Sequence, residues 1–302
     1  MPRPASEQTL PRNGIPLVQN ETRAPQGAFA PDTPLIDPFV PVDLPDGQRW
    51  STWSSIERLQ RGPEPRPSWV VTHDESIDTE LGVLKTGKEA DVFVIERTAV
   101  CAPQCSTLMA AKRYRDAEHR SFRRHAGYTE GRRIKDTREA RAVATGTAFG
   151  KQVAAGVWAQ AEWSALVDLW TSGVPVPYPV QIDGREILME LVVDADGRPA
   201  PRLAATRPTA EQLEVWFDQL RAALIVLCGK GIVHGDLSAY NILVAESGLV
   251  LIDLPQIVDV IANPNGVEFL HRDCVNVCTW FSSKGHACDG DELFAELLGY
   301  AF

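Results

Sequence analysis

The sequence predicts an α+β protein of two lobes, a small β-rich lobe followed by a short and mainly helical one. Three observations predict this architecture. Short apolar segments bounded by turn residues recur between residues 81 and 191, as β-strands do. Residues 153–170 interrupt them with apolar positions at helical spacing. After Pro208 the apolar residues return to helical spacing, so the second lobe is expected to be helical.

The N-terminal part of the chain is expected to lie outside both lobes. The chain has 302 residues, of which 44% are hydrophobic, enough to fill two cores. Residues 1–50 are rich in proline and polar residues without a sustained hydrophobic period, which predicts a disordered arm. Residues 51–80 are interpreted as an N-terminal extension with one short helix, from Trp53 to Gln60. Gly62 and Pro63 are expected to end that helix.

The first lobe is expected to span residues 81–192. Its helix, residues 153–170, has apolar residues at every fourth position, which marks one face. Asp183 and Gly184 form a strong hairpin-turn signal between the last two strands. The apolar face of the helix consists of Val153, Val157, Ala161, Ala165 and Leu169. The predicted strands are residues 81–85, 91–96, 108–114, 180–182 and 187–191.

A basic insert, residues 113–150, is expected between a strand and the helix of the first lobe. Residues 112–141 carry eleven Lys and Arg against five Asp and Glu, in a chain whose net charge is −10. This asymmetry has two interpretations. The insert is either a solvated surface segment or a contact with phosphate groups of RNA or nucleotide. The acidic balance of the whole chain argues against a general nucleic-acid coat protein.

The second lobe is expected to span residues 193–302. Thr209 and Gln212 fit a capping box for a helix that runs to Gly229. Two apolar runs, residues 242–244 and 249–252, flank a turn and predict a β-hairpin. The remaining residues, 255–302, are expected to be largely helical.

The segment His234–Leu243, followed by Leu251-Ile252-Asp253, carries the strongest chemical signal. Asn241 follows Asp236 by five residues, the spacing of a kinase catalytic loop. Asp236 is expected to hold a substrate hydroxyl. The predicted hairpin would bring Asp253 back beside Asn241, and two oxygen ligands converging on one point suit a magnesium ion. His234 is expected to be a structural histidine, because Ile232 and Val233 indicate burial.

Two further features fit a phosphate-binding site in the first lobe. Lys112 ends a strand between a glycine-bearing turn and a candidate acid, Glu162, on the predicted helix. That order suits a lysine that contacts phosphates and is held by the acid. The turn around Gly87 and Lys88 offers backbone amides and a charge to the same phosphates. It has a single glycine, so the turn alone is a weak signal.

The cysteine spacing and the hydropathy of the chain indicate no zinc site and no membrane segment. The six cysteines, among them Cys101, Cys105, Cys274 and Cys278, do not have a common zinc spacing, so reduced thiols are expected. No apolar run reaches the length of a membrane span, and the N-terminus does not resemble a signal peptide. A cytoplasmic protein without a membrane partner is therefore expected.

The chain resembles the RIO family of atypical protein kinases and ATPases, and is nearest to its first subfamily. The resemblance covers residues 78–285 and is most specific in the Leu-Ser-x-Tyr-Asn form after Asp236. Further matching segments are Thr86–Ala90, Ala110–Lys112, Trp158–Glu162, Gly173–Pro177, Met189–Glu190, Leu251–Asp253, Asn263–Pro264, Glu268–Leu270 and Arg272–Asp273. The sequence departs from the family pattern at Pro255, two residues after the metal aspartate, where a proline restricts the backbone.

The resemblance implies a two-lobed protein-kinase-like fold that binds ATP and Mg²⁺ between the lobes. It implies Asp236 as the proton acceptor, Asn241 and Asp253 as magnesium ligands and Lys112 as a phosphate ligand. It also implies that Asp253 can carry the phosphoryl group as an aspartyl phosphate. The expected nucleotide contacts are Gly87, Lys88, Val92, Ala110, Lys112, Glu162, Met189, Glu190, Val192 and Leu243, with adenine held by the backbones of Glu190 and Val192.

Three functions compete at this point. The first is a RIO-like serine/threonine kinase or ATPase whose phosphoryl acceptor is a protein or the chain itself. No Ala-Pro-Glu segment follows Asp253, so the peptide groove of ordinary protein kinases is not expected. The second is a small-molecule phosphotransferase of the aminoglycoside or choline kinase type. The third is an ATP-gated scaffold that binds RNA or a ribosomal particle through the basic insert.

Overall fold

The structure of the chain is a computed structural model that describes residues 43–115, 148–254 and 257–301. Its residue contacts separate Met1–Asp43 from a second unit, Leu44–Phe302, and the fold described below is that of the second unit. Most of the expected arm, most of the basic insert and the departure at Pro255 lie outside the described residues.

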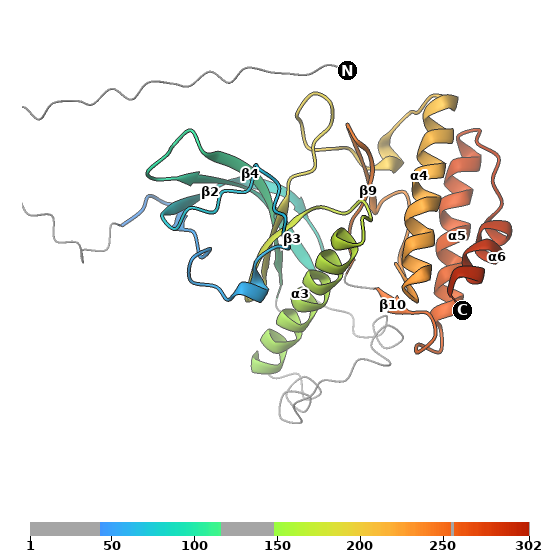
Figure 1. The fold of residues 1–302 in the computed structure, drawn as a ribbon, viewed down its shortest axis with the longest axis horizontal. Coiled ribbons are helices and arrows are strands. Elements are labelled where there is room, and N and C mark those ends of the chain that lie inside the picture. Colours follow the sequence, from blue (N-terminus) through green and yellow to red (C-terminus); the bar gives the residue numbers. More distant parts are fainter. Residues whose placement is uncertain (1–42, 116–147, 255–256, 302) are drawn as a thin grey trace, which may run out of the picture. The chain divides into compact units, whose positions relative to one another are not determined.

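A curled antiparallel sheet of six strands forms the first lobe, with strand order β1-β2-β3-β4-β6-β5 (Figure 1). All five predicted strands are found within it. Their alternation of apolar and polar residues lets the sheet bury one set of side chains against the rest of the lobe. The strands are β1 (Gln48–Trp50), β2 (Ser76–Thr86), β3 (Ala90–Ala99), β4 (Ser106–Tyr114), β5 (Pro179–Asp183) and β6 (Glu186–Glu190).

The sheet begins earlier in the chain than the apolar pattern predicts. Residues 48–50, expected in the arm, form β1, and β2 begins at Ser76 rather than Leu81. The first half of β2 has polar residues that are buried, so it lacks the alternation of an amphipathic strand. Asp78 accepts two hydrogen bonds from Arg97, at 2.6 and 2.9 Å, and both side chains are buried. A paired and hydrogen-bonded charge is the form in which such groups enter a core.

The long helix of the first lobe is α3 (Ala148–Thr171), which packs against the sheet near β4, β5 and β6 (Figure 1). It is longer than predicted, and its buried face differs from the expected one. Val157 is 39% exposed, whereas the predicted face requires it to be buried. Most of the buried positions are separated by three or four residues, as one face of a helix of 3.6 residues per turn requires. They are Ala155, Ala159, Glu162, Trp163, Leu166 and Leu169.

The helix predicted from Trp53 to Gln60 is wrong except for a single 3₁₀ turn, η1 (Arg58–Gln60). The Ser51 side chain accepts the backbone N–H of Trp53 at 3.2 Å, a local bond that competes with helix formation. The chain instead bends so that Trp53 is buried in a small core on the sheet, against residues such as Tyr178.

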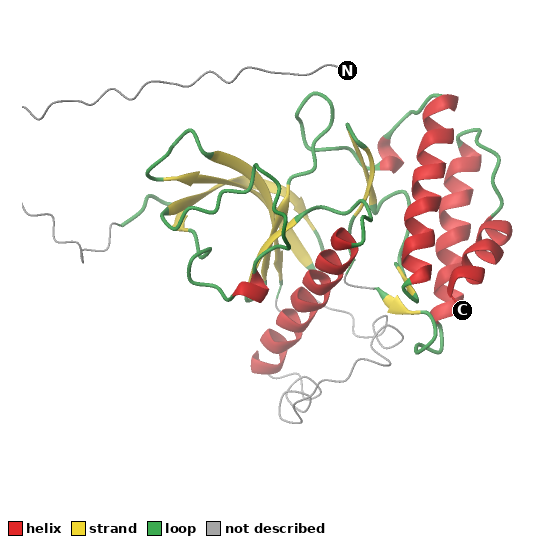
Figure 2. Ribbon diagram, in the orientation of Figure 1, coloured by secondary structure: helices red, strands yellow, loops and turns green. Residues whose placement is uncertain are grey.

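Helices dominate the second lobe, as predicted, and lie beside the two small β-ribbons (Figure 2). Thr209 and Gln212 form the expected capping box, with bonds of 3.2 and 2.9 Å. The expected hairpin is β8 (Ile242–Ala245) with β9 (Gly248–Leu251). The other elements are η3 (Leu203–Ala205), α4 (Ala210–Gly229), β7 (Ile232–Val233), β10 (Val258–Asp259), α5 (Gly266–Ser283) and α6 (Gly290–Ala301), with β7 pairing β10.

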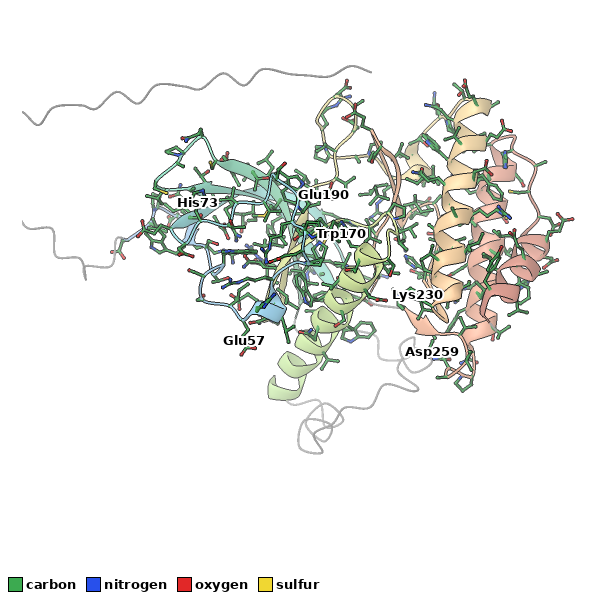
Figure 3. The ribbon with its side chains drawn as sticks, in the orientation of Figure 1. Glu57, His73, Trp170, Glu190, Lys230 and Asp259 are labelled. Carbon is green, nitrogen blue, oxygen red and sulfur yellow. The ribbon has the colours of Figure 1, made fainter. Side chains whose placement is uncertain are left out.

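These lobes confirm the predicted fold class, an α+β protein with a β-rich first lobe and a mainly helical second lobe. An ion pair links them at the foot of α4, where Lys230 Nζ lies 3.0 Å from Oδ1 of Asp168 on α3. Figure 3 labels Lys230 at this end of α4. Among the described residues, no helix has the length and apolarity needed to cross a bilayer.

Candidate active site

A cavity of about 860 Å³ lies between the sheet and the second lobe. Every predicted site residue lines it except Asn241, which contacts one of the lining residues. The predicted residues that line it are Gly87, Lys88, Val92, Ala110, Lys112, Glu162, Met189, Glu190, Val192, Asp236, Leu243 and Asp253. Residues far apart in the sequence therefore surround one space.

Lys112 is the centre of the polar contacts in this cavity. Its Nζ donates to Oε1 of Glu162 at 2.6 Å and to Oδ1 of Asp253 at 2.7 Å. Burial acts to lower the pKa of Lys112, but the charges around it, led by Glu162, hold that pKa well above its ordinary value. The lysine therefore carries a positive charge between two carboxylates, where phosphate oxygens would also be attracted.

Tyr114, two residues along β4, completes this arrangement. Its hydroxyl donates to Oε2 of Glu162, and its ring lies 5.4 Å from the Lys112 ammonium. Because strand residues two apart share a face, Lys112 and Tyr114 both face α3. Burial is the largest cause that raises the pKa of Tyr114 well above its usual range, so its hydroxyl keeps its proton to donate.

Asp253 is held in an unusual backbone conformation. Its φ of 69° is the one positive φ of a non-glycine residue in the described chain. Such conformations are costly and concentrate at functional sites. The Lys112 charge lowers the pKa of Asp253 to about 2, with further help from Lys85. The carboxylate therefore stays ionised at neutral pH, which a magnesium ligand requires.

Asp236 and Asn241, the residues of the expected catalytic loop, contact each other directly. Nδ2 of Asn241 donates to the backbone oxygen of Asp236 at 2.8 Å and to its carboxylate at 3.4 Å. The expected hairpin returns the chain to Asn241, because the Ile252 N–H donates to the backbone oxygen of Asn241 at 3.0 Å. Burial raises the pKa of Asp236 above its ordinary value. A raised pKa suits a carboxylate that accepts a proton during a reaction.

Asp273 on α5 holds the backbone of the loop around Asp236. Its two carboxylate oxygens accept the N–H groups of Gly235 and Leu237 at 2.8 and 2.9 Å. Burial raises the pKa of Asp273 to about 6. His234 is also buried, and its Nε2 lies 3.0 Å from the backbone oxygen of Ile252. These contacts give both side chains a positioning role, and the histidine is buried as expected.

The turn at Gly87 and Lys88, which is expected to contact phosphates, joins β2 to β3. The Gly87 N–H donates to the Ala90 oxygen at 3.0 Å, and a Cβ at Gly87 would lie 2.7 Å from that same oxygen. Any residue with a side chain would disturb this turn, which explains the single glycine. Asp91 anchors the base of the turn through two bonds of 2.6 Å from Arg115.

The connector between the lobes follows β6. Glu190, labelled in Figure 3, lies where the chain leaves the sheet, and its carboxylate accepts the Tyr178 N–H at 3.0 Å. The Val192 oxygen already accepts a bond from Ala200 at 2.9 Å. Because this oxygen is engaged, the expected adenine contact of Val192 falls to its N–H, and the contact of the Glu190 backbone stays a prediction.

The donor set of the cavity fits a magnesium–nucleotide complex. Mg²⁺ prefers oxygen ligands, and Asp253 supplies an ionised carboxylate. Asn241 uses its amide nitrogen for Asp236, so its amide oxygen is the atom suited to the metal. The described residues contain no cluster of three His, Cys, Asp or Glu that would form a metal cage. Asp253 and Asn241 alone would suffice as protein ligands, because Mg²⁺ is usually bound by one or two protein groups together with phosphates and water.

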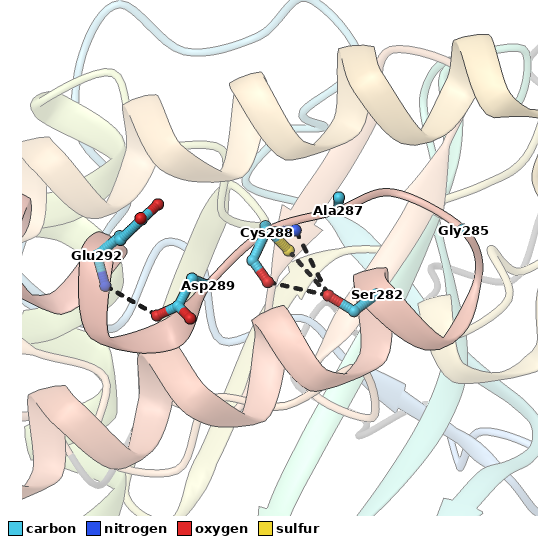
Figure 4. Close-up of a pocket in the computed structure, with 6 residues that line it drawn as sticks. All are labelled: Ser282, Gly285, Ala287, Cys288, Asp289 and Glu292. Atoms are coloured by element: carbon cyan, nitrogen blue, oxygen red, sulfur yellow. Dashed lines mark hydrogen bonds between the residues drawn. The ribbon is translucent and has the colours of Figure 1, made fainter.

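A second hollow lies where α5 meets α6 (Figure 4). Ser282, Cys288, Asp289 and Glu292 are among its lining residues, and the Ser282 hydroxyl donates to the Cys288 oxygen at 2.9 Å. It is more open than the cavity between the lobes and contains none of the predicted site residues.

Sequence reasoning missed several residues of the cavity. Tyr114 had a detectable signal, because it shares a strand face with Lys112. Lys85 and Arg202 had none, since single basic residues in strands and loops are usually solvated. The other unpredicted lining residues are Leu84, Glu89, Ala90, Leu166, Pro177, Leu191, Pro199, Ala200 and Ile252.

Fold and site together define a two-lobed protein kinase-like phosphotransferase. The RIO domain model matches residues 96–293. The RIO-type serine/threonine-protein kinase Rio1 of Haloferax volcanii is 35% identical over 231 residues, which cover 76% of this chain and 73% of that protein. The chain therefore belongs to the RIO family, and so to the protein kinase class of enzymes.

Two eukaryotic relatives share shorter segments. Serine/threonine-protein kinase rio1 of Dictyostelium discoideum is 30% identical over 67% of this chain and 33% of its own length. Serine/threonine-protein kinase RIO3 of Homo sapiens is 33% identical over 47% of this chain and 28% of its own length. The match thus spans a third or less of the length of these two proteins.

Proposed function

We propose that the chain is an ATP- and Mg²⁺-dependent RIO-type serine/threonine kinase or ATPase. The observation that carries this proposal is the convergence of Lys112, Asp236 and Asp253 on one cavity, with Asn241 beside them. Lys112 would bind phosphate oxygens, and the Glu162 carboxylate would hold the lysine in place. Bound magnesium would neutralise phosphate charge during transfer.

Asp236 would accept the proton of an attacking hydroxyl. Its raised pKa supports this role, because proton transfer is most efficient when the pKa of the base approaches the working pH. Asn241 would hold the Asp236 side chain and backbone in position through the two bonds from its amide nitrogen. The phosphoryl acceptor would be a protein hydroxyl or one of the chain's own.

Asp253 offers a second acceptor. Its carboxylate is ionised and held in a fixed conformation beside Lys112, which supports attack on the terminal phosphate to form an aspartyl phosphate. In that step an oxygen of Asp253 forms a bond to the γ-phosphorus, and the bond to the ADP oxygen breaks. Water would then release inorganic phosphate, giving net ATP hydrolysis.

Labelled nucleotide tests the proposal and separates its two branches. The chain is incubated with Mg²⁺ and ATP labelled in the γ-phosphate, and the labelled protein is treated with hydroxylamine. Release of the label indicates an acyl phosphate, the form expected on Asp253, whereas a stable label indicates transfer to a serine or threonine. Absence of both protein labelling and phosphate release would contradict the proposed function.

Contact with RNA or a ribosomal particle is a further proposal for the basic insert, residues 113–150. Its support is the excess of Lys and Arg in an acidic chain. Substitution of Arg123, Arg124, Arg132 and Arg133 by glutamine should weaken RNA binding and reduce its dependence on salt. An unchanged salt dependence in the substituted chain would refute this contact.

A further inference from the structure

Two basic residues in the cavity are not explained by the contacts described so far. Lys85 is the second-to-last residue of β2 in the first lobe, and Arg202 directly precedes η3 in the second lobe. Both line the cavity. Among the described residues, neither forms an ion pair, in contrast to Lys112, which contacts two carboxylates.

Lys85 lies in the same row of the sheet as Lys112. The strand register pairs Lys85 with Val92 and Val92 with Lys112. Residues that are directly opposite each other in an antiparallel sheet project to the same face, so both lysines face the cavity. Two strand spacings separate their backbones, a distance of about 10 Å.

The β8–β9 hairpin fixes the backbone of Arg202 on the opposite side of the cavity. Arg202 forms a β-bridge with Leu243, and the Val244 N–H donates to the Pro201 oxygen at 2.9 Å. The backbone of Arg202 is therefore attached to β8, which begins directly after Asn241. From this position Arg202 lines the cavity.

Lys85 lies within range of the charges of Arg202, Lys112 and Asp253. Partial removal from water lowers the pKa of Lys85, and the charges of Arg202 and Lys112 lower it further, while Asp253 opposes them. Two cations that form no ion pair among the described residues, one on each side of the cavity, are suited to an anion that lies between them. Arginine and lysine are also the side chains that most often bind phosphate oxygens.

We propose that Lys85 and Arg202 form a clamp across the cavity that holds the phosphate chain of the nucleotide. The clamp rests on the proposed function, because it assumes that this cavity takes ATP. It goes further by assigning phosphate recognition to residues from both lobes. Bound phosphates would bridge the sheet and the second lobe, and affinity would depend on the number of phosphates.

Calorimetric titration of the Lys85→Met and Arg202→Met variants tests the clamp. Each variant should bind ATP about 10-fold more weakly than wild type, the loss expected for one hydrogen bond to a charged group. Affinity for adenosine should stay the same, because adenosine lacks phosphates. Lys85→Arg should restore most of the ATP affinity. The double variant should lose less than the product of the single losses, because both cations contact one anion.

Arg198→Met is the matched control. Arg198 is an exposed arginine in the same connecting segment, and its ion pairs are with Asp194 and Asp196 outside the cavity. Its substitution should leave ATP affinity unchanged. Equal losses for ATP and adenosine in the Lys85 and Arg202 variants would refute the clamp, as would unchanged ATP affinity. If wild type binds no nucleotide, the proposed function fails and the clamp fails with it.

Discussion

Lys112 Nζ lies 2.7 Å from Oδ1 of Asp253, so the sheet and the second lobe are joined by an ion pair inside the cavity. This pair connects the expected phosphate ligand to the expected metal ligand. On nucleotide binding, magnesium would pair with Asp253 and the phosphates would pair with Lys112. Each charge of the ion pair would thus gain a new partner of opposite charge. The site is therefore electrostatically balanced before it binds a nucleotide, which avoids an uncompensated buried charge.

Removing the Lys112 charge should abolish turnover. In a Lys112→Met variant, phosphates lose their buried cation, and the pKa of Asp253 should rise from about 2 toward its ordinary value. We expect Mg²⁺-dependent ATP turnover to fall about 100-fold or more, the scale for lost electrostatic stabilisation. Lys284→Met, an exposed lysine on the far end of α5, serves as the control. Near-normal turnover in Lys112→Met would contradict the assigned role.

The Tyr114 hydroxyl should affect nucleotide affinity more than the chemical step. Tyr114→Phe keeps the ring beside Lys112 but removes the hydrogen bond to Glu162. One such bond contributes about 1 kcal/mol, so KM for ATP should rise about 5-fold with little change in kcat. Tyr178→Phe is the matched control, since its hydroxyl bonds to Pro63 away from the cavity. A similar rise in KM for both variants would indicate a general effect on the lobe.

Asp236→Ala should separate binding from phosphoryl transfer. Loss of the proton acceptor should reduce transfer to a hydroxyl about 100-fold or more. Affinity for ATP should change little, because the other lining residues remain. Transfer to a peptide hydroxyl or to the chain itself, measured with labelled ATP, provides the readout. Full transfer activity in this variant would show that the catalytic loop is misassigned.

Stability should depend on pH through Asp273. Its folded-state pKa of about 6 lies above its ordinary value of 3.8, so the folded chain holds the proton more tightly than the unfolded chain. The stabilisation is therefore complete below the ordinary pKa and is lost as pH rises through 6. As pH rises from below 3.8 to above 6, the free energy of unfolding of the wild type should fall by roughly 3 kcal/mol relative to that of Asp273→Asn. Denaturant unfolding at several pH values tests this, and a pH-independent difference would refute it.

Much of the site could be predicted because its signals are local in the sequence. The spacing of Asp236 and Asn241 sets one loop, and the hairpin after Asn241 returns Asp253 to it. The capping box at Thr209 similarly fixes the start of α4 through neighbouring residues. Each of these features depends on residues within about one turn or one hairpin.

The rest depends on contacts between residues far apart in the chain. Asp78 belongs to a strand only because Arg97 pairs with it in the core, so polar residues conceal the start of β2. Arg202 faces the cavity only because β8 holds its backbone. The buried face of α3 likewise depends on how the helix lies on the sheet, which a simple four-residue repeat does not capture.

Titration of ATP in the presence and absence of magnesium tests the central claim most directly. In wild type, Mg²⁺ should tighten ATP binding, because the metal would link Asp253 and Asn241 to the phosphates. In Asp253→Ala, that tightening should largely disappear. A control variant, Asp183→Asn, changes the exposed last residue of β5 and should respond as wild type does. An Asp253→Ala variant that keeps the full magnesium response would contradict the account.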